Sequence, residues 1–211
     1  ELANALGYIY IDTGAMYRCV TLYAIENGMF SGKSLDSDAL EQRIDEIKIS
    51  FCRDELSGKV LAVLNGRNVE KEIRSMSVSE RVSNVAKQPY VRQRLVEQQQ
   101  AMGRKKGIVM DGRDIGTTVF PDAELKIYVT ASAEVRALRR YDELKAKGMP
   151  ADYDDILKNV QERDYIDSHR EVSPLRKADD AIELDNSNMT IPEQKAWLME
   201  KYREALVLVQ K

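Results

Sequence analysis

Short apolar runs recur along this chain, and polar residues close each of them. The runs at residues 8–11 and 107–110 are too short for helices, so they predict strands. The second run is apolar throughout, which is typical of a parallel strand buried on both faces. Two later runs, at residues 125–129 and 181–184, predict further strands.

Longer stretches with helical periodicity separate these runs. One helix is expected from the first polar turn to about Glu26, and others at about 78–102, 153–170 and 192–207. Pro89 falls inside the second of these stretches and is expected to kink it or to begin a new helix. Strands that alternate with helices predict an α/β domain in which helices flank a parallel sheet.

The rhythm changes between residues 33 and 75. Asn65-Gly66 is a strong hairpin signal there, because it separates an apolar run from a second short strand-like segment. We therefore expect a small antiparallel sheet inserted into the α/β domain, with strands at about 47–51, 59–64 and 67–69.

Charged residues follow the second strand directly, at Asp111-Gly112-Arg113-Asp114. Ligands of open α/β sheets gather at the carboxyl ends of the strands, so these carboxylates and this guanidinium are candidates for a binding site. The alternative is a surface turn of solvated charges, which is the commoner meaning of such a tetrapeptide in isolation.

A similar polar turn follows the first strand. Asp12 or Thr13 fits the N-cap of the next helix, and capping alone would explain either residue. Arg18 lies near the same end of that helix, where its charge opposes the helix dipole unless an anion is bound. A phosphate or carboxylate ligand is one interpretation of Arg18, and an arginine that reaches out to solvent is the other.

A third candidate is the face formed by Arg163, Asp167 and Arg170, which are spaced four and then three residues apart on an expected helix. A solvated, salt-bridged stripe is the commonest meaning of that spacing. Arginine also carries planar, paired donors that suit phosphates, so a phosphate site is the second interpretation.

Composition limits the classes of function. The chain has 211 residues, of which 43% are hydrophobic, enough for one α/β domain with an insertion. Its 32 basic and 35 acidic residues leave a net charge of −3, so a nucleic-acid partner is not expected. We find no membrane span or secretory signal in the sequence. Cys19 and Cys52 are expected to be buried, without a disulfide or metal role, and His169 to lie at the surface of a cytoplasmic protein.

Four motifs occur in a fixed order: Asp12 to Arg18, Glu72-Ile73-Arg74, Asp111 to Thr117 with Phe120 to Ala123, and Glu162 to Arg170 with Ser173-Pro174-Leu175. Together they resemble bacterial cytidylate kinases over essentially the whole chain. The resemblance implies the P-loop nucleoside monophosphate kinase fold and the phosphorylation of CMP and dCMP by ATP, with Mg²⁺, in a monomer without nucleic-acid or membrane partners.

The resemblance also implies how the chain is divided. Residues 1–32 and 76–211 would form the core kinase domain, and residues from about 148 to 174 would form a helical lid. Residues 33–75 would form the antiparallel insert, near the monophosphate site.

Individual roles follow from the same resemblance. Arg18 and Arg113 would hold the phosphate of CMP, while Arg163 and Arg170 would come from the mobile lid that closes over the reacting groups. Arg163 and Arg113 are therefore the expected catalytic residues. Asp111, at the end of its strand, is the candidate for holding a water bound to Mg²⁺.

Base and sugar recognition involve a second set of residues. Cytosine has an amino donor at position 4 and acceptors at N3 and O2, which suit a carboxylate and an arginine, and Asp114 and Arg92 fit these parts. The family uses the matching positions around the base, together with Thr13 and Arg170. The positions that match its contacts to the pentose are Ser83, Arg163 and Asp167.

One departure concerns the family's glycine-rich phosphate loop, which ends in Gly-Lys-Ser or Gly-Lys-Thr. Gly32-Lys33-Ser34 fails this motif because Asn27 stands where a glycine is required and no apolar strand precedes it. We therefore expect about 20–25 further residues upstream of Glu1, carrying a strand and this loop, and the ATP-binding residues stay unknown. Two alternatives remain: a CMP-binding module without activity, and a monophosphate kinase that prefers UMP.

Overall fold

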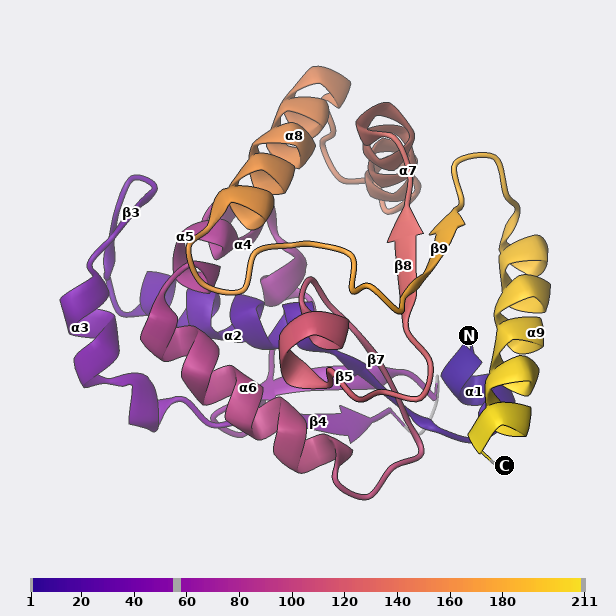
Figure 1. Cartoon of the computed structure of the whole chain (residues 1–211). Coiled ribbons are helices and arrows are strands. Elements are labelled where there is room, and N and C mark those ends of the chain that lie inside the picture. The colour runs from indigo at the N-terminus through magenta and orange to yellow at the C-terminus, as the bar shows by residue number, and fades with distance from the viewer. Residues whose placement is uncertain (1, 55–57, 210–211) are drawn as a thin grey trace.

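A computed structural model describes residues 2–54 and 58–209 of the chain, and it shows an α/β protein with parallel strands and surrounding helices (Figure 1). The larger core lies around one central helix, and a smaller apolar cluster lies between two later helices. No helix in the described part of the chain is long and apolar enough to cross a membrane.

The four strands expected at the apolar runs are present as two parallel pairs. They are β1 (Ile9–Asp12) with β7 (Ile108–Asp111), and β8 (Ile127–Thr130) with β9 (Ile182–Asp185). Each strand extends into the polar residue that follows its apolar run, because these residues still pair across the ladder. Asp12 is consequently set directly beside Asp111.

The expected burial of residues 107–110 on both faces is wrong. Ile108, Val109 and Met110 are only partly buried. Within the described residues β7 pairs with β1 alone, so its other edge is not covered by a strand.

The central helix is α2 (Thr13–Glu26), and it ends where the sequence predicts. Asp12 is its N-cap, because Asp12 Oδ1 accepts a hydrogen bond from the Ala15 backbone at 3.0 Å. Ten of its fourteen residues are buried, which makes this helix the centre of the larger core. The side chain of Thr13 is therefore not needed as the cap and can form a different hydrogen bond.

The helix expected at about 78–102 is divided into three. It is replaced by α4 (Met76–Ser79), α5 (Val82–Ala86) and α6 (Pro89–Gly103). Pro89 occupies the first turn of α6, where its fixed φ and its missing N–H are tolerated, so a new helix begins there rather than a kink.

The antiparallel sheet expected between residues 33 and 75 is present and has the order β4 (Ile49–Arg53), β5 (Val60–Leu64), β6 (Arg67–Asn68). Asn65 and Gly66 both have positive φ, at 49° and 82°, as a two-residue hairpin turn requires. Residues 55–57, between β4 and β5, lie outside the described residues.

Before this sheet the chain forms a small hairpin and a short helix. Gly32 and Lys33 make the turn between β2 (Phe30–Ser31) and β3 (Ser34–Leu35), which confirms that this segment is an ordinary connection. α3 (Ser37–Gln42) follows. Elsewhere in the chain and after α3, single helical turns occur at η1 (Ile44–Glu46), η2 (Glu72–Arg74) and η3 (Ile115–Val119).

Cys19 is buried as expected, but Cys52 is exposed because it lies on β4 of the antiparallel sheet.

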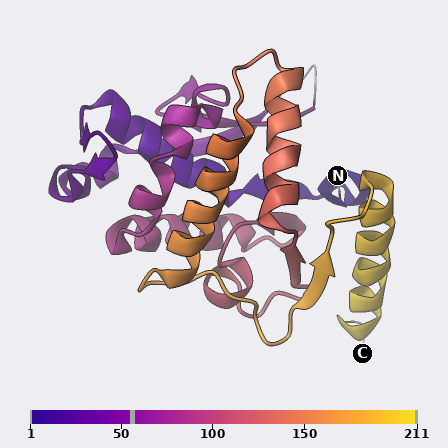
Figure 2. The same ribbon diagram turned by 90° about the horizontal axis from the view of Figure 1, so that it is seen from above.

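A helical hairpin stands over one end of the strands and consists of α7 (Ala133–Ala146) and α8 (Tyr153–His169) (Figure 2). The two helices enclose an apolar cluster of their own, and Arg136 of α7 holds Asp164 of α8 through both carboxylate oxygens. α8 confirms the helix expected at 153–170, and His169 is exposed at its end.

The two ends of the described chain lie on the same side of the molecule. α9 (Ile191–Val209) runs beside α1 (Leu2–Leu6) in both views (Figures 1 and 2). The hydroxyl groups of Tyr8 and Tyr202 are hydrogen-bonded at 2.8 Å, which ties α9 to the segment before β1.

Candidate active site

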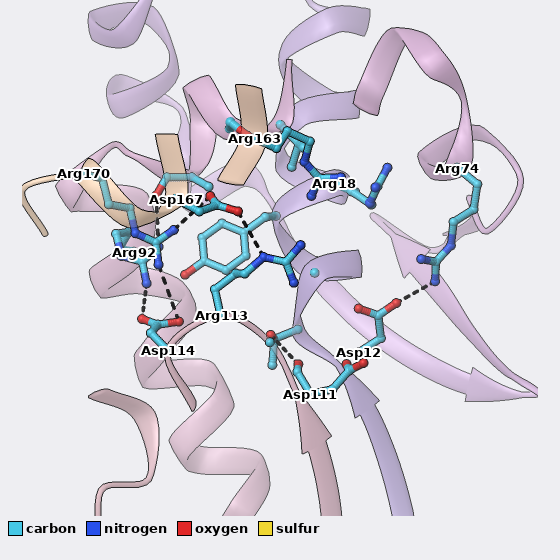
Figure 3. Close-up of a pocket in the computed structure, with 17 residues that line it drawn as sticks. Asp12, Arg18, Arg74, Arg92, Asp111, Arg113, Asp114, Arg163, Asp167 and Arg170 are labelled. Carbon is cyan, nitrogen blue, oxygen red and sulfur yellow. Dashed lines mark hydrogen bonds and ion pairs between the residues drawn. The ribbon is translucent and has the colours of Figure 1, made fainter. Parts of the chain in front are cut away.

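The predicted site residues gather around one pocket of about 260 Å³, close to the roughly 300 Å³ at the lower end of small-molecule sites. The pocket lies where the carboxyl ends of β1 and β7 meet α2, α5, α6 and α8 (Figure 3). Asp111 lines the pocket. So do all nine predicted substrate-binding residues, which are Thr13, Arg18, Ser83, Arg92, Arg113, Asp114, Arg163, Asp167 and Arg170.

The floor of the pocket is the pair of strand ends. Thr13 donates its hydroxyl hydrogen to the Asp111 backbone carbonyl at 2.7 Å, so its oxygen can only accept from a ligand. A Cβ at Gly112 would meet the Thr13 hydroxyl at 2.2 Å, which explains why the residue between Asp111 and Arg113 has no side chain. The turn is therefore shaped by close packing, and it is more than a loop of solvated charges.

At one end of the pocket, which we call the base end, Arg92, Asp114 and Arg170 form a buried charged cluster. Arg92 Nη2 donates to Asp114 Oδ2, and the two side chains are only 3% and 5% exposed. Arg92 Nη1 donates to the Ala86 carbonyl at 3.0 Å, and Arg170 Nη2 lies 4.0 Å from Asp114 Oδ1. The carboxylate thus has a guanidinium near each oxygen, and it is the acceptor among three charged groups.

Asp167 lies between the base end and the rest of the pocket. It accepts from Arg113 Nε at 3.0 Å and lies 3.5 Å from Arg170 Nη1 (Figure 3). Asp167 and Arg170 are both buried, at 4% and 8% exposure. The interpretation of this face of α8 as a solvated stripe is therefore wrong.

At the opposite end, which we call the cationic end, Arg18 lies inside the pocket rather than in solvent. Its Nη1 donates to the Ile73 carbonyl and to Ser79 Oγ, both at 3.0 Å. Burial, and after it the positive charges of Arg163 and Arg74, lower the pKa of Arg18 to about 9. A guanidinium whose charge is disfavoured in this way would be stabilised by a bound anion.

Arg163 of α8 has the same electrostatic character. Burial, and then the nearby charge of Arg113, lower the pKa of Arg163 to about 10. Its Nε is buried and has no hydrogen-bond partner among the described residues. Positive charge is therefore concentrated at the cationic end, where Arg18, Arg113 and Arg163 lie close enough for their charges to interact.

Two further arginines of this end carry no role in the sequence analysis. Arg74 lines the pocket and holds Asp12 Oδ2 at 2.7 Å and Glu70 Oε1 at 3.1 Å. Arg140 of α7 lies near Arg18 and Arg163, since its charge lowers the pKa of both. Arg74 belongs to a motif quoted above, so a signal existed for it, whereas a helix-surface arginine such as Arg140 carries no local signal.

Unpaired polar atoms mark the pocket as a place for a ligand. Among the described residues, seven buried side-chain nitrogen or oxygen atoms have no hydrogen-bond partner. Five of the seven belong to pocket residues: Tyr17 Oη, Ser83 Oγ, Arg92 Nε, Arg163 Nε and Arg170 Nη2. Each of the five can donate a hydrogen, so the pocket suits a ligand that is rich in acceptor atoms.

The carboxylates at the strand ends have the chemistry of a magnesium site that is completed by substrate. Burial, and then repulsion by Asp12, raise the pKa of Asp111, while Tyr10 donates to Asp111 Oδ2 at 2.9 Å. Among the described residues no three side chains of the metal-ligating types come together. Mg²⁺ commonly uses one or two carboxylates and takes its other ligands from phosphates and water, so the pair Asp12 and Asp111 fits it.

Comparisons with known proteins identify the family of this chain. The family model described as cytidylate kinase matches residues 1–204. The cytidylate kinase of Bacteroides fragilis is 62% identical over 206 residues, which cover 98% of this chain and 90% of the relative. That of Bacteroides thetaiotaomicron is 60% identical, covering 96% and 88%, and that of Porphyromonas gingivalis is 57% identical, covering 97% and 89%. This chain belongs to the cytidylate kinase family.

Proposed function

We propose that this protein transfers a phosphoryl group from ATP to CMP and dCMP, within the P-loop nucleoside monophosphate kinase fold. The observation that carries the proposal is the two-ended pocket. It joins a buried carboxylate flanked by guanidiniums to a cluster of arginines with excess positive charge. A nucleoside monophosphate has the matching shape, with a base at one end and an anionic phosphate at the other.

The base end suits cytosine. Asp114 accepts from the amino group at position 4, and the guanidiniums of Arg92 and Arg170 face the ring acceptors. Uracil carries an acceptor at position 4, which the Asp114 carboxylate repels. The Thr13 oxygen, whose hydrogen is already donated to a backbone carbonyl, is a second acceptor for the amino group.

The sugar lies between the two ends. Ser83 Oγ is buried and has no partner in the part of the chain that the structure describes, and Arg163 and Asp167 border the same space from α8. A hydroxyl, an arginine and a carboxylate can each bond to a pentose hydroxyl group. Because none of them requires a hydroxyl at a single position, the site accepts dCMP as well as CMP.

The phosphate lies among the arginines of the cationic end. Arg18 and Arg113 hold the phosphate of CMP, and Arg163 donates to the phosphoryl group while it is transferred. Phosphoryl transfer depends on alignment and charge neutralisation, so arginines that lie close together around one pocket are suited to it. Their charges favour the transition state most, because negative charge then spreads over the transferred oxygens.

Mg²⁺ would be held near Asp111 through water, with Asp12 beside it, and would supply charge neutralisation for the phosphates of ATP. Tyr10 and Arg74 orient these two carboxylates before any ion arrives. The residues that bind ATP itself are not among those identified in this chain.

The helical hairpin of α7 and α8 supports the lid that we predict at about residues 148–174, since it carries Arg163, Asp167 and Arg170 into the pocket. The division into a core at 1–32 and 76–211 and an insert at 33–75 stays a prediction. So do the monomeric state and the cytoplasmic location.

The decisive experiment is a coupled assay of ADP formation by the natural protein with ATP, Mg²⁺ and each of CMP, dCMP and UMP. We expect turnover with CMP and dCMP and much weaker turnover with UMP. Calorimetric binding of CMP without turnover would support the binding-module alternative, and preference for UMP would support the other. The shared name of the relatives disfavours both alternatives.

A further inference from the structure

Arg74 connects the cationic end of the pocket to the carboxylates at the strand ends. It lies on η2, directly after the antiparallel insert, and lines the pocket. Its Nη2 donates to Asp12 Oδ2 at 2.7 Å (Figure 3), and its Nε donates to Glu70 Oε1 at 3.1 Å. After burial and the charge of Arg163, the charge of Arg74 is the next cause of the lowered pKa of Arg18. Arg74 therefore lies between a proposed cation site and a proposed phosphate site.

The carboxylates of Asp12 and Asp111 lie side by side, and Arg74 supplies positive charge to both. The two residues are partners in the register of β1 and β7. Burial, and then repulsion by Asp12, raise the pKa of Asp111, and the charge of Arg74 opposes this increase. Among the ion pairs of the described residues, Asp12 pairs with Arg74 alone. Arg74 thus gives Asp12 the kind of charge that a bound Mg²⁺ would give it.

The ion pair between Arg74 and Asp12 can be exchanged at low cost. The two side chains are 46% and 22% exposed, and ion pairs that water reaches contribute little to stability. A divalent cation at Asp12 would repel the guanidinium of Arg74, because like charges would then be neighbours. A phosphate beside Arg18 would offer that guanidinium a new partner, since arginine can bind phosphate through two donors at once.

We propose that Arg74 exchanges partners during binding: it leaves Asp12 to Mg²⁺ and turns to the phosphate of CMP. This inference rests on the proposed function. It makes Arg74 a further substrate-binding residue, beside Arg18 and Arg113. Because the guanidinium that leaves the cation site is the one that serves the anion site, Mg²⁺ and CMP should each increase the affinity of the protein for the other.

The test is Arg74→Met in the natural protein, which removes the charge and keeps an unbranched side chain. Mn²⁺ binding is followed without nucleotide through the paramagnetic signal of the free ion, and CMP binding is followed by calorimetry without ATP. We expect the dissociation constant of Mn²⁺ to fall about three- to tenfold, because Asp12 loses a competing charge. In the presence of Mg²⁺, the dissociation constant of CMP should rise by a similar factor. Mg²⁺ should increase the affinity for CMP in the wild type and not in the variant.

Two further variants are the controls. Arg67→Met removes the same charge from an exposed arginine of β6 that pairs with Glu26 and Glu72 outside the pocket. Both affinities should stay at their wild-type values in this variant. Arg74→Lys keeps the charge and should bind Mn²⁺ like the wild type. If Arg67→Met shifts both affinities as Arg74→Met does, the net charge of the protein is responsible and the inference is overturned.

The other outcomes are separable. Weaker binding of Mn²⁺ in Arg74→Met would mean that Arg74 only holds Asp12 in place for the cation, which overturns the exchange. Weaker binding of CMP with unchanged binding of Mn²⁺ would also overturn it, because Arg74 would then serve the phosphate alone. A wild-type protein that binds CMP, together with Arg74→Met of unchanged affinities, would refute the inference alone. A wild-type protein that fails to bind CMP would refute the proposed function itself.

Discussion

The two ends of the pocket contain the same residue types but differ in how their charges are compensated. At the base end, Arg92 and Asp114 are buried against each other, with Arg170 on the second carboxylate oxygen. At the cationic end, burial and mutual repulsion lower the pKa of Arg18 and of Arg163. Burial and the charge of Arg92 lower the pKa of Arg170 as well. The difference lies in the pairing: the base end contains a formed ion pair, whereas Arg18 and Arg163 form none among the described residues.

This difference assigns the two ends different work in the proposed reaction. A preassembled ion pair holds donors and acceptors in fixed positions, which allows the protein to discriminate between similar bases. Arginines with unbalanced positive charge stabilise the transition state most, because negative charge then concentrates between them, and this raises the rate of phosphoryl transfer. The variants below separate the two ends, and they are ordered by the size of the expected effect.

The largest effect is expected on stability at the base end. Asp114→Ala leaves Arg92 buried without its carboxylate and removes one of the two carboxylates near Arg170, so the free energy of unfolding in urea should fall by about 3–5 kcal/mol. Glu124→Ala breaks an exposed pair with Lys106 and should change it by about 1 kcal/mol or less. Equal small losses in both variants would show that the base end is not preassembled.

The next effect is expected on rate at the cationic end. Arg163→Met should lower kcat by about a hundredfold, because it removes a donor to the transferred phosphoryl group. The melting temperature of this variant should not fall, since Arg163 is partly buried, its pKa is lowered, and its Nε has no hydrogen-bond partner among the described residues. Arg94→Met, at an exposed arginine of α6, is the control with unchanged turnover. Turnover near that of the wild type in Arg163→Met would contradict the assigned role.

A smaller effect is expected on the choice of base. Asp114→Asn keeps the shape of the side chain but presents an amide to position 4. It should reduce kcat/KM for CMP more than for UMP, by a difference of about 1–3 kcal/mol. Equal losses with the two substrates would mean that Asp114 acts through the fold alone.

The smallest effect is expected where the two ends meet. Asp167→Asn weakens the carboxylate that Arg113 and Arg170 share, and it should raise KM by about three- to tenfold with a smaller change in kcat. The increase should differ between CMP and dCMP, because these substrates differ by one hydroxyl of the pentose that borders Asp167. Asp154→Asn, exposed on the same helix, should raise neither KM.

Much of this architecture can be predicted from local sequence signals. Apolar runs give the four parallel strands, and Asn65-Gly66 gives its hairpin. The ends of the strands are harder to predict from sequence, because Asp12 and Asp111 are paired in the sheet although both are charged. The burial of β7 could not be predicted from residues 107–110, since it depends on what lies beside the strand in space.

The site, like the fold, can be predicted only in part. Motif residues such as Arg18 and Asp114 can be identified from the sequence, but which charged groups they pair with cannot. The spacing of Arg163, Asp167 and Arg170 favoured a solvated stripe, and only the packing of α8 over the strand ends buries two of them. The pairing of Arg74 with Asp12 could not be predicted either, because the two residues meet only after the chain has folded.

The close approach of Gly112 to Thr13 limits which substitutions this chain tolerates at these two positions. A methyl group at position 112 would strike the Thr13 hydroxyl at 2.2 Å and Ile115 at 2.9 Å. Shrinking residue 13 to make room removes the hydroxyl that holds the Asp111 carbonyl. In a library of random variants, glycine should therefore persist at position 112, whereas Thr13→Ser, which keeps the hydroxyl, should be accepted.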